Sequence, residues 1–225
     1  TETTISVLVS EGIKVYTSEG FVSTPMVSLS TKLHNAFAGI VITASHNPPS
    51  YNGFKIKAHY GGPAIQAEID AVEAKIPDAW NCTHRTLEDL VNDSNVEVID
   101  MEQEYIDHVE KNFDIEAIRN SPMKFGYDAM YGAGQNVVRR LLPDAFLMHC
   151  DDNPGFEGQA PEPIARNLEP FAAEIKQRGL SSGLATDGDA DRIGMFDENG
   201  DFVDSHHIIL LLIRYLVEFK KESGA

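Results

Sequence analysis

Residues 43–57 read TASHNPPSYNGFKIK, and this stretch decides how the rest of the chain is interpreted. It follows the apolar run 36–42, which is short and β-branched near its end, as expected of a buried strand. Ser45 therefore lies just beyond the carboxyl end of a strand, where open α/β sheets place their ligands. The pair Pro48-Pro49 keeps the loop out of a helix, and Asn52-Gly53 predicts a second turn.

This loop presents Ser45 next to His46, with Lys55 ten residues after the serine. We interpret the set as an arrangement for handling a phosphate group, and the alternative is an ordinary surface loop. A serine hydrolase is disfavoured because adjacent side chains seldom point at one another. In addition, no G-x-S-x-G elbow surrounds the serine.

A second stretch, residues 184–195, reads LATDGDADRIGM and carries Asp187, Asp189 and Asp191 at alternate positions. Three hard oxygen ligands at this spacing can converge on one small divalent cation. A solvated acidic turn and an EF-hand calcium loop are the alternatives. Glu198 falls at the twelfth EF-hand position, but Arg192 occupies the sixth, where that motif requires glycine, and the flanks read as strands. The sequence therefore favours magnesium or a similar ion.

TASHNP with the downstream NGFK, and TDGDADR, resemble the phosphoserine loop and the metal loop of the α-D-phosphohexomutases. That family includes phosphoglucomutase, phosphomannomutase and their amino-sugar relatives. Residues 128–134 (DAMYGAG) and 161–163 (PEP) resemble segments that lie between these motifs in the family. The resemblance covers essentially the whole chain and implies two consecutive α/β layered domains, with mixed sheets flanked by helices, out of the family's four.

The resemblance implies a reaction as well as a fold. Ser45 would be carried as phosphoserine, and phosphate would move between the 1- and 6-positions of a hexose phosphate. A hexose 1,6-bisphosphate would be both intermediate and activator. One Mg²⁺ per active site, held by Ser45 and by Asp187, Asp189 and Asp191, would stabilise charge during in-line transfer.

Charge balance requires basic partners at such a site. A phosphoserine carries about two negative charges and three aspartates add three more, so one divalent cation leaves about three. Lys55 is implied to assist proton or phosphate handling near Ser45, and Arg192 to orient the aspartates or to contact phosphate. His46 is a candidate for proton transfer or positioning, and its alternative role is a structural hydrogen bond inside the loop.

Composition limits the class of protein. The 225 residues include 35 acidic and 18 basic side chains, a net charge of −17, which would repel nucleic acid and anionic membrane surfaces. Cys82 and Cys150 lie far apart without metal-ligand spacing and are expected to be free thiols. The longest apolar run, 208–213, is interrupted by Arg214 and is too short to span a bilayer. We expect a cytoplasmic protein.

Periodicity and turn residues predict strands alternating with helices in both halves of the chain. Strands are expected over 12–16, 123–127, 145–149, 183–186 and 193–196, and helices over 24–37, 65–76, 100–113, 137–142, 168–178 and 205–221, the last capped by Ser205. Residues 78–95 are expected to form a loop, Gly132 to Gly134 a tight turn rather than a phosphate loop, and His206-His207 a surface feature. A boundary near Asn120 predicts domains over 1–120, incomplete at its start, and 121–225.

No compact Arg/Ser/Thr loop that could hold the far phosphate of a sugar substrate follows the acidic stretch. We therefore expect this chain to be a fragment whose partners are a hexose phosphate and missing C-terminal domains of the same polypeptide. Two other functions stay open. One is a metal-dependent sugar-phosphate phosphatase that uses the same serine, and the other is a noncatalytic divalent-metal-binding module.

Overall fold

The computed structural model describes residues 1–80 and 83–224, and the chain folds into two compact units of mixed α/β structure. The first unit comprises Thr1–Ile42 and Gly53–His108, and the second Thr43–Asn52 and Val109–Ala225. Residues 43–52, which we call the serine loop, thus pack with the second half of the chain, although they lie in the first half of the sequence. The division into domains over 1–120 and 121–225 stays a prediction, because the two units are defined by contacts within the structure and do not test where a domain begins or ends.

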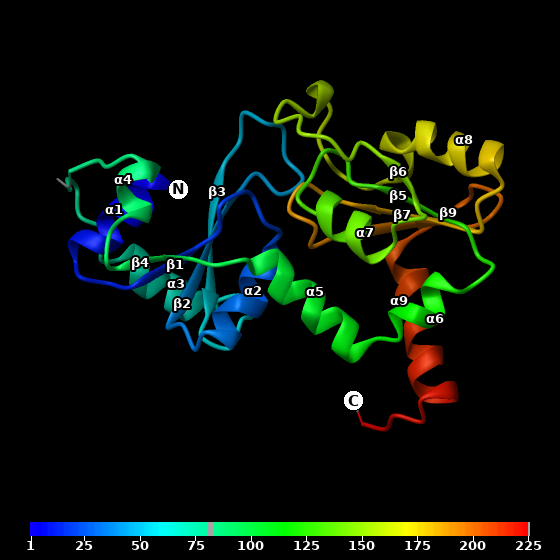
Figure 1. Ribbon diagram of the computed structural model, residues 1–225, viewed down its shortest axis with the longest axis horizontal. Helices are drawn as coiled ribbons and strands as arrows, with labels where there is room; N and C mark the ends of the chain where they lie inside the picture. Colours follow the sequence, from blue (N-terminus) through cyan, green and yellow to red (C-terminus); the bar gives the residue numbers. More distant parts are fainter. Residues whose placement is uncertain (81–82, 225) are drawn as a thin grey trace. The chain divides into compact units, whose positions relative to one another are not determined.

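The second unit is built on a five-stranded sheet with the order β6-β5-β7-β8-β9 (Figure 1). The strands are β5 (Phe125–Asp128), β6 (Phe146–Met148), β7 (Ser182–Thr186), β8 (Ile193–Phe196) and β9 (Phe202–Val203). β5 pairs in parallel with β6 and β7, whereas β7, β8 and β9 pair antiparallel to one another. The predicted strands of this half are confirmed, and the parallel strands end at one edge of the sheet.

Helices cover both faces of this sheet (Figure 1). Side chains alternate along a strand, so Ala185 of β7 packs under α8 (Glu169–Arg178), while Leu184 packs on the opposite side with α7 (Gln135–Leu141). The larger core lies under α8 and contains Met130, Leu168, Phe171, Ile175, Leu180, Ala185 and Phe196. α8 ends at Arg178, as predicted, and is followed by Gly179, whose φ of 59° is left-handed.

The last helix differs from expectation at both ends. α9 (Ser205–Arg214) is capped by Asp204 and not by Ser205, because the Asp204 carboxylate accepts the backbone N–H groups of His206 and His207. The helix continues into a π-helical turn, η3 (Tyr215–Phe219), and does not reach residue 221. Shorter elements of this unit are α6 (Ile115–Arg119), η1 (Phe156–Gly158) and η2 (Ala165–Asn167).

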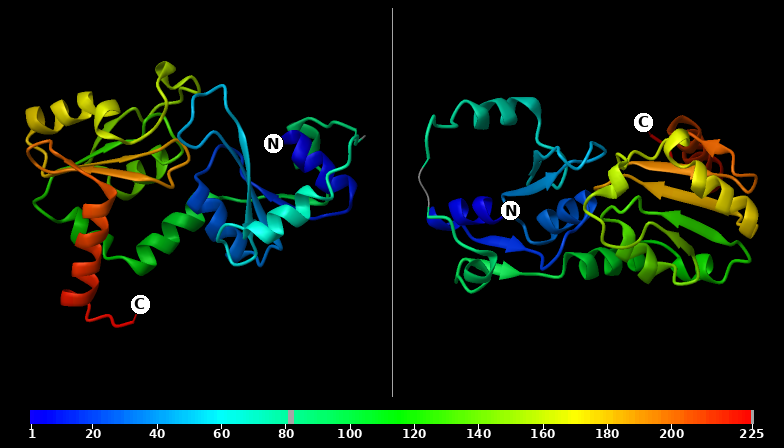
Figure 2. Two further views of the ribbon diagram at one scale, coloured as in Figure 1. Left: turned by 180° about the vertical axis from the view of Figure 1, so that it is seen from behind. Right: turned by 90° about the horizontal axis from the view of Figure 1, so that it is seen from above.

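The first unit holds two small sheets with helices around them (Figure 2). Its elements are α1 (Glu2–Ser10), β1 (Val15–Thr17), α2 (Thr24–Leu33), β2 (Ala38–Thr43), β3 (Gly53–Ala58), α3 (Gln66–Glu73), α4 (Leu87–Val91) and β4 (Val96–Val98). The helix α5 (Met101–Asn112) begins in this unit and ends in the second. β1 pairs in parallel with β4, and β2 pairs with β3. The helices expected over 65–76 and 100–113 are confirmed, whereas the helix expected over 24–37 ends at Leu33. α2 begins as predicted at Thr24-Pro25, where the Ser23 hydroxyl accepts the N–H of Met26.

Two local expectations in the first half are wrong. Asn52-Gly53 is not a turn, because Gly53 begins β3 and the second turn is closed earlier, where Tyr51 N donates to Pro48 O at 2.9 Å. β2 is also not a fully buried strand. Its burial alternates, with Val41 buried and Ala38 exposed, as in a strand with one covered face.

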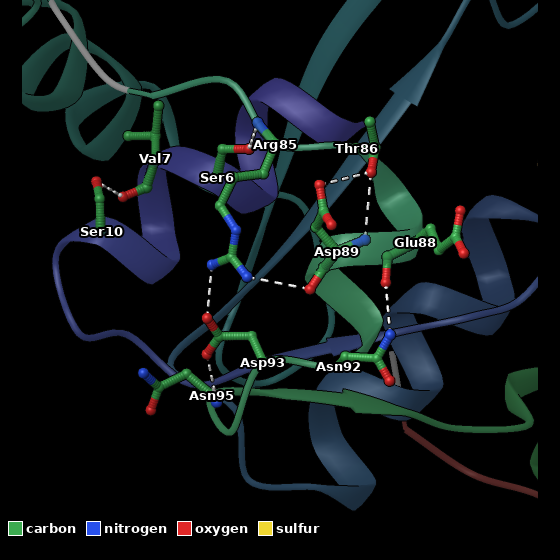
Figure 3. A network of polar contacts seen from close by, with 10 residues as sticks. All are labelled: Ser6, Val7, Ser10, Arg85, Thr86, Glu88, Asp89, Asn92, Asp93 and Asn95. Atoms are coloured by element: carbon green, nitrogen blue, oxygen red, sulfur yellow. Dashed lines mark hydrogen bonds and ion pairs between the residues drawn. The ribbon is translucent and has the colours of Figure 1, made fainter.

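The segment 78–95, expected to form a loop, includes the short helix α4. Its Leu90 is fully buried against Ile5 of α1 and Val96 of β4. A polar network around Arg85 fixes the segment, as Figure 3 shows. The Arg85 guanidinium donates to the Asp93 carboxylate and to the carbonyl of Asp89, and its backbone N–H donates to Ser6 of α1. Tertiary contacts therefore form a helix that is too short to show periodicity.

Two further expectations concern the cysteines and membranes. Cys150 is a buried free thiol, and burial raises its pKa to about 11. Cys82 lies outside the described residues. Within the described part of the chain, every helix is either too short or too polar to cross a bilayer.

The core under α8 predicts a large effect of truncating Phe171, whose ring is fully buried and meets Phe196 edge-on at 5.9 Å. Phe171→Ala should lower the free energy of unfolding of the second unit by about 3–5 kcal/mol, measured by urea denaturation. Phe113→Ala is the matched control, because that ring is 62% exposed; its effect should stay within about 0.5 kcal/mol. Equal effects of the two substitutions would contradict this assignment of the core.

Candidate active site

The acidic stretch forms the turn that joins β7 to β8. Thr186 pairs with Ile193 across the two antiparallel strands, and residues 187–192 connect them. Asp187 organises this turn, because one oxygen of its carboxylate, Oδ1, accepts the backbone N–H groups of Asp191 and Arg192, each at 3.0 Å. The Asp187 carbonyl also accepts the N–H of Ala190 at 3.0 Å. We call residues 187–192 the acidic turn.

The acidic turn gathers three carboxylates in a small volume. Oxygen atoms of Asp187, Asp189 and Asp191 lie within 4.8 Å of one another, and the first two side chains are buried. Burial raises the pKa of the Asp187 carboxyl to about 6, the N–H donated by Arg192 opposes that shift, and the neighbouring carboxylates add to it. Such a group of hard oxygen ligands is stabilised by a cation and suits Mg²⁺ or a similar ion.

Arg192 is the cationic side chain next to this group. Its Nε lies 4.0 Å from Oδ2 of Asp187, and its side chain is about half exposed. A pair at this distance contributes only modest attraction, because one partner is half exposed to solvent. The position is compatible with either expected role, orienting the aspartates or contacting a phosphate.

The serine loop reaches the acidic turn within the second unit. Ser45 Oγ donates to Oδ2 of Asp187 at 3.4 Å, so the structure brings together the hydroxyl and the carboxylate that the sequence placed 142 positions apart. The backbone N–H of Ser45 donates to Thr43 Oγ1 at 2.7 Å, and Asn47 N donates to Ala44 O at 2.9 Å. These bonds hold Ser45 at a φ of 54°, a left-handed conformation that costs a residue with a side chain about 1–2 kcal/mol.

Backbone packing fixes the distance between the serine loop and the acidic turn. A Cβ atom added to Gly188 would lie 2.5 Å from the carbonyl oxygen of Ser45 and 3.0 Å from Cγ of Pro161. Only glycine therefore allows the loop to approach this closely. Pro161 belongs to the segment 161–163, which the sequence also singled out, and its side chain is fully buried.

The remaining predicted residues are placed as follows. His46 follows Ser45 in the loop, and its Nδ1 is buried without a hydrogen-bond partner among the described residues, so the alternative of a structural hydrogen bond is not seen for this nitrogen. Lys55 lies on β3 of the first unit and is half-buried.

Sequence reasoning missed two residues, Asp128 and His149, which form a hydrogen-bonded pair. Asp128 does begin the segment 128–134, but nothing in the sequence links it to His149.

Comparison with known proteins agrees with this geometry. Residues 1–80 match the family model described as phosphoglucomutase/phosphomannomutase, alpha/beta/alpha domain I. Residues 103–200 match the model described as domain II of the same family. The two matches follow each other in the family's order and together cover well over half of the chain.

Individual relatives match along almost the whole chain. A protein from Pyrococcus furiosus named as a probable phosphoglucosamine mutase is 31% identical over 95% of this chain and 46% of its own length. A phosphopentomutase from Thermococcus kodakarensis is 32% identical, with the same coverage of 95% and 46%. A solved structure from Thermus thermophilus, whose name places it among the phosphomannomutases, superposes with a TM-score of 0.86 at 30% identity. That match covers 98% of this chain and 49% of the other.

The chain spans about half the length of the curated relatives it matches. The resemblance inferred from the serine loop and the acidic turn is confirmed by both domain models and by these relatives. The chain belongs to the phosphoglucomutase/phosphomannomutase family.

Proposed function

We propose that this chain exchanges a phosphoryl group between Ser45 and a sugar phosphate, as the serine-bearing half of a phosphohexomutase. One observation carries the proposal: Ser45 Oγ lies 3.4 Å from Asp187, whose oxygen atoms belong to a group of three carboxylates within 4.8 Å. A hydroxyl beside a cation site is an arrangement for phosphoryl transfer. The complete mutase reaction is proposed for a polypeptide of the relatives' length, since this chain matches about half of it.

The exchange is a displacement at phosphorus. In one direction the bond between phosphorus and Ser45 Oγ breaks, a bond from phosphorus to a sugar hydroxyl oxygen forms, and the hydroxyl proton passes to a base. The resulting hexose 1,6-bisphosphate then returns its other phosphoryl group to Ser45, so that phosphate has moved between the 1- and 6-positions. His46, beside the serine, and Lys55 are our candidates for moving the proton or holding the phosphate.

A divalent cation fits the residues of this site. Ser45, Asp187, Asp189 and Asp191 would hold it, and when bound it supplies positive charge that offsets the charge of the phosphoryl oxygens. The raised pKa of Asp187 supports this assignment, because burial and the neighbouring carboxylates of Asp189 and Asp191 disfavour its charged form, which a bound cation would favour. With a phosphate on Ser45 the site would still carry about three excess negative charges, which Arg192 and Lys55 would reduce.

For the substrate we propose a class of compound rather than one particular sugar. The relatives matched at 30–32% identity carry names that refer to phosphorylated glucosamine, mannose and pentose. Similarity at this level therefore supports a sugar phosphate without selecting the sugar. Within that class a hexose 1- or 6-phosphate is our proposal.

Cation binding at the acidic turn should depend on pH through Asp187. Its pKa is raised from 3.8 to about 6. Without a cation, the stability that the neutral carboxyl contributes is therefore present below its ordinary pKa and is lost as the pH rises through about 6. A bound cation offsets this loss of stability, because it favours the charged Asp187 carboxylate. Mn²⁺ should thus raise the melting temperature clearly at about pH 7.5 and much less at about pH 5, where a proton competes for Asp187.

Two variants test the location of that effect. Asp189→Asn removes one ligand and should weaken Mn²⁺ binding, followed by electron paramagnetic resonance, by at least about tenfold. Glu198→Gln is the matched control, because this exposed carboxylate occupies the twelfth EF-hand position but lies outside the acidic turn. If Glu198→Gln weakened binding as much as Asp189→Asn, an EF-hand-like site would replace the one proposed here.

The phosphoserine is tested by intact-mass analysis. After incubation with Mg²⁺ and glucose 1,6-bisphosphate, the wild-type chain should gain the mass of one phosphoryl group, because the sugar P–O bond breaks and a bond to Ser45 Oγ forms. Ser45→Ala should gain none, whereas the control Ser50→Ala, in the same loop, should react like the wild type. A phosphoryl group on Ser45→Ala would contradict the assignment of the acceptor.

The same incubation separates the two other functions. Steady release of inorganic phosphate that depends on Ser45 would indicate a phosphatase. Mn²⁺ binding with no phosphoryl transfer to the chain would indicate a noncatalytic metal-binding module.

A further inference from the structure

A second turn packs directly against the backbone of the acidic turn. It is formed by residues 128–134, which begin at the last residue of β5, and Ala133 N donates to the carbonyl of Gly188 at 2.9 Å. A Cβ atom added to Gly132 would lie 2.7 Å from the carbonyl oxygen of Asp187 and 2.9 Å from Cα of Gly188. The backbones of the two turns are therefore in direct contact. A shift of the supporting turn would move the residues that carry the carboxylates.

The supporting turn has an unfavourable backbone conformation. Met130 and Tyr131 are consecutive residues with φ of 47° and 61°, and a left-handed conformation costs about 1–2 kcal/mol for each such residue. The Asp128 carboxylate compensates, since its Oδ1 accepts the N–H of Met130 at 2.8 Å. Asp128 is only 1% exposed. A buried carboxylate in this position requires a partner, because an unpaired charge away from water is strongly destabilising.

His149 is that partner. Its Nδ1 lies 2.9 Å from Oδ1 and 3.1 Å from Oδ2 of Asp128, and the hydrogen bond to this carboxylate raises the pKa of His149. The backbone carbonyl of His149 accepts the N–H of Tyr131 at 2.9 Å, and the two rings lie 4.7 Å apart. His149 thus holds both ends of the left-handed pair, one through Asp128 and the other directly.

We propose that the Asp128–His149 pair positions the acidic turn for its cation without contacting the ion. The proposal rests on the proposed function, which assigns the cation to Asp187, Asp189 and Asp191. The path runs from His149 through Asp128 and the left-handed residues to Gly132 and Ala133, and from these to Gly188. Residues that support metal ligands without touching the metal commonly tune affinity by holding the ligands in place. The simpler alternative is that the pair only stabilises a local turn.

Two substitutions at position 149 separate these roles. His149→Leu keeps much of the volume but removes the donor to Asp128. His149→Asn keeps a side-chain N–H near the position of Nδ1, and asparagine tolerates the left-handed φ of 48° found there. We expect His149→Leu to weaken Mn²⁺ binding about tenfold and His149→Asn to bind within about twofold of the wild type.

A matched control comes from the first unit. His34 pairs with the Glu104 carboxylate at 2.6 Å and lies 4.6 Å from the ring of Tyr16, so it repeats the chemistry of His149 at another place in the fold. His34→Leu should lower the melting temperature by an amount similar to His149→Leu and leave Mn²⁺ affinity within about twofold of the wild type. Melting curves confirm that each variant is folded at the temperature of the titration.

The outcomes separate this inference from the function on which it rests. Weaker binding by folded His149→Leu, with His149→Asn and His34→Leu near the wild type, supports the positioning role. Wild-type affinity in His149→Leu would overturn it and leave the proposed cation site intact. A comparable loss of affinity in His34→Leu would also overturn it, because general destabilisation would then explain the effect. A wild-type chain that binds no Mn²⁺ would overturn both proposals.

Discussion

Three carboxylates lie close together in one short turn, and the second unit must hold them there against their mutual repulsion. Like charges within 4.8 Å of one another, two of them on buried side chains, would separate or take up protons unless the backbone held them. The antiparallel pairing of β7 and β8 closes the turn, and Asp187 fixes it by accepting two backbone N–H groups. The sheet therefore keeps together groups that repel one another, and this repulsion is what a cation would relieve.

Glycines and residues with a left-handed φ lie where the backbone brings the serine and the three carboxylates close together. Gly188 and Gly132 have no room for a side chain, because the serine loop presses on the first and the acidic turn on the second. Ser45 and Ala190 have φ of 54° and 55°, which is uncommon for residues with a side chain. Strain of this kind persists only where surrounding contacts impose it. Two of the strained positions are therefore in the site itself: the serine, and a residue between two of the aspartates.

Much of the fold could be predicted because its signals are local. Gly179 follows the end of α8, and the Asn199-Gly200 pair lies between β8 and β9, so turn residues separate these elements in the sequence. α4 could not be found in this way, since five residues show no period and only the burial of Leu90 and the contacts of Arg85 form the helix. The cap of α9 was misplaced by one residue because aspartate and serine are both good caps, and only the structure shows which side chain accepts the N–H groups.

Part of the candidate site could be predicted from the sequence, and part could not. The ligand types and their spacing could be read from the acidic stretch, and the serine from its loop. The packing of that loop with the second unit could not, because it depends on the lack of a side chain at Gly188. The Asp128–His149 pair was equally invisible, because its members lie 21 positions apart and on different strand ends. Contacts that position a site are long-range and leave no periodic signal.

We propose that one cation is shared by the serine oxygen and the three carboxylates of the acidic turn. Anomalous diffraction at the manganese edge, from crystals of this chain grown with Mn²⁺, would locate the ion. We expect a single strong peak within bonding distance of Asp187, Asp189 and Asp191, with the side-chain oxygen of Ser45 directed at it. A peak coordinated elsewhere, or one at the aspartates with Ser45 turned away, would show that the serine and the aspartates do not share a cation.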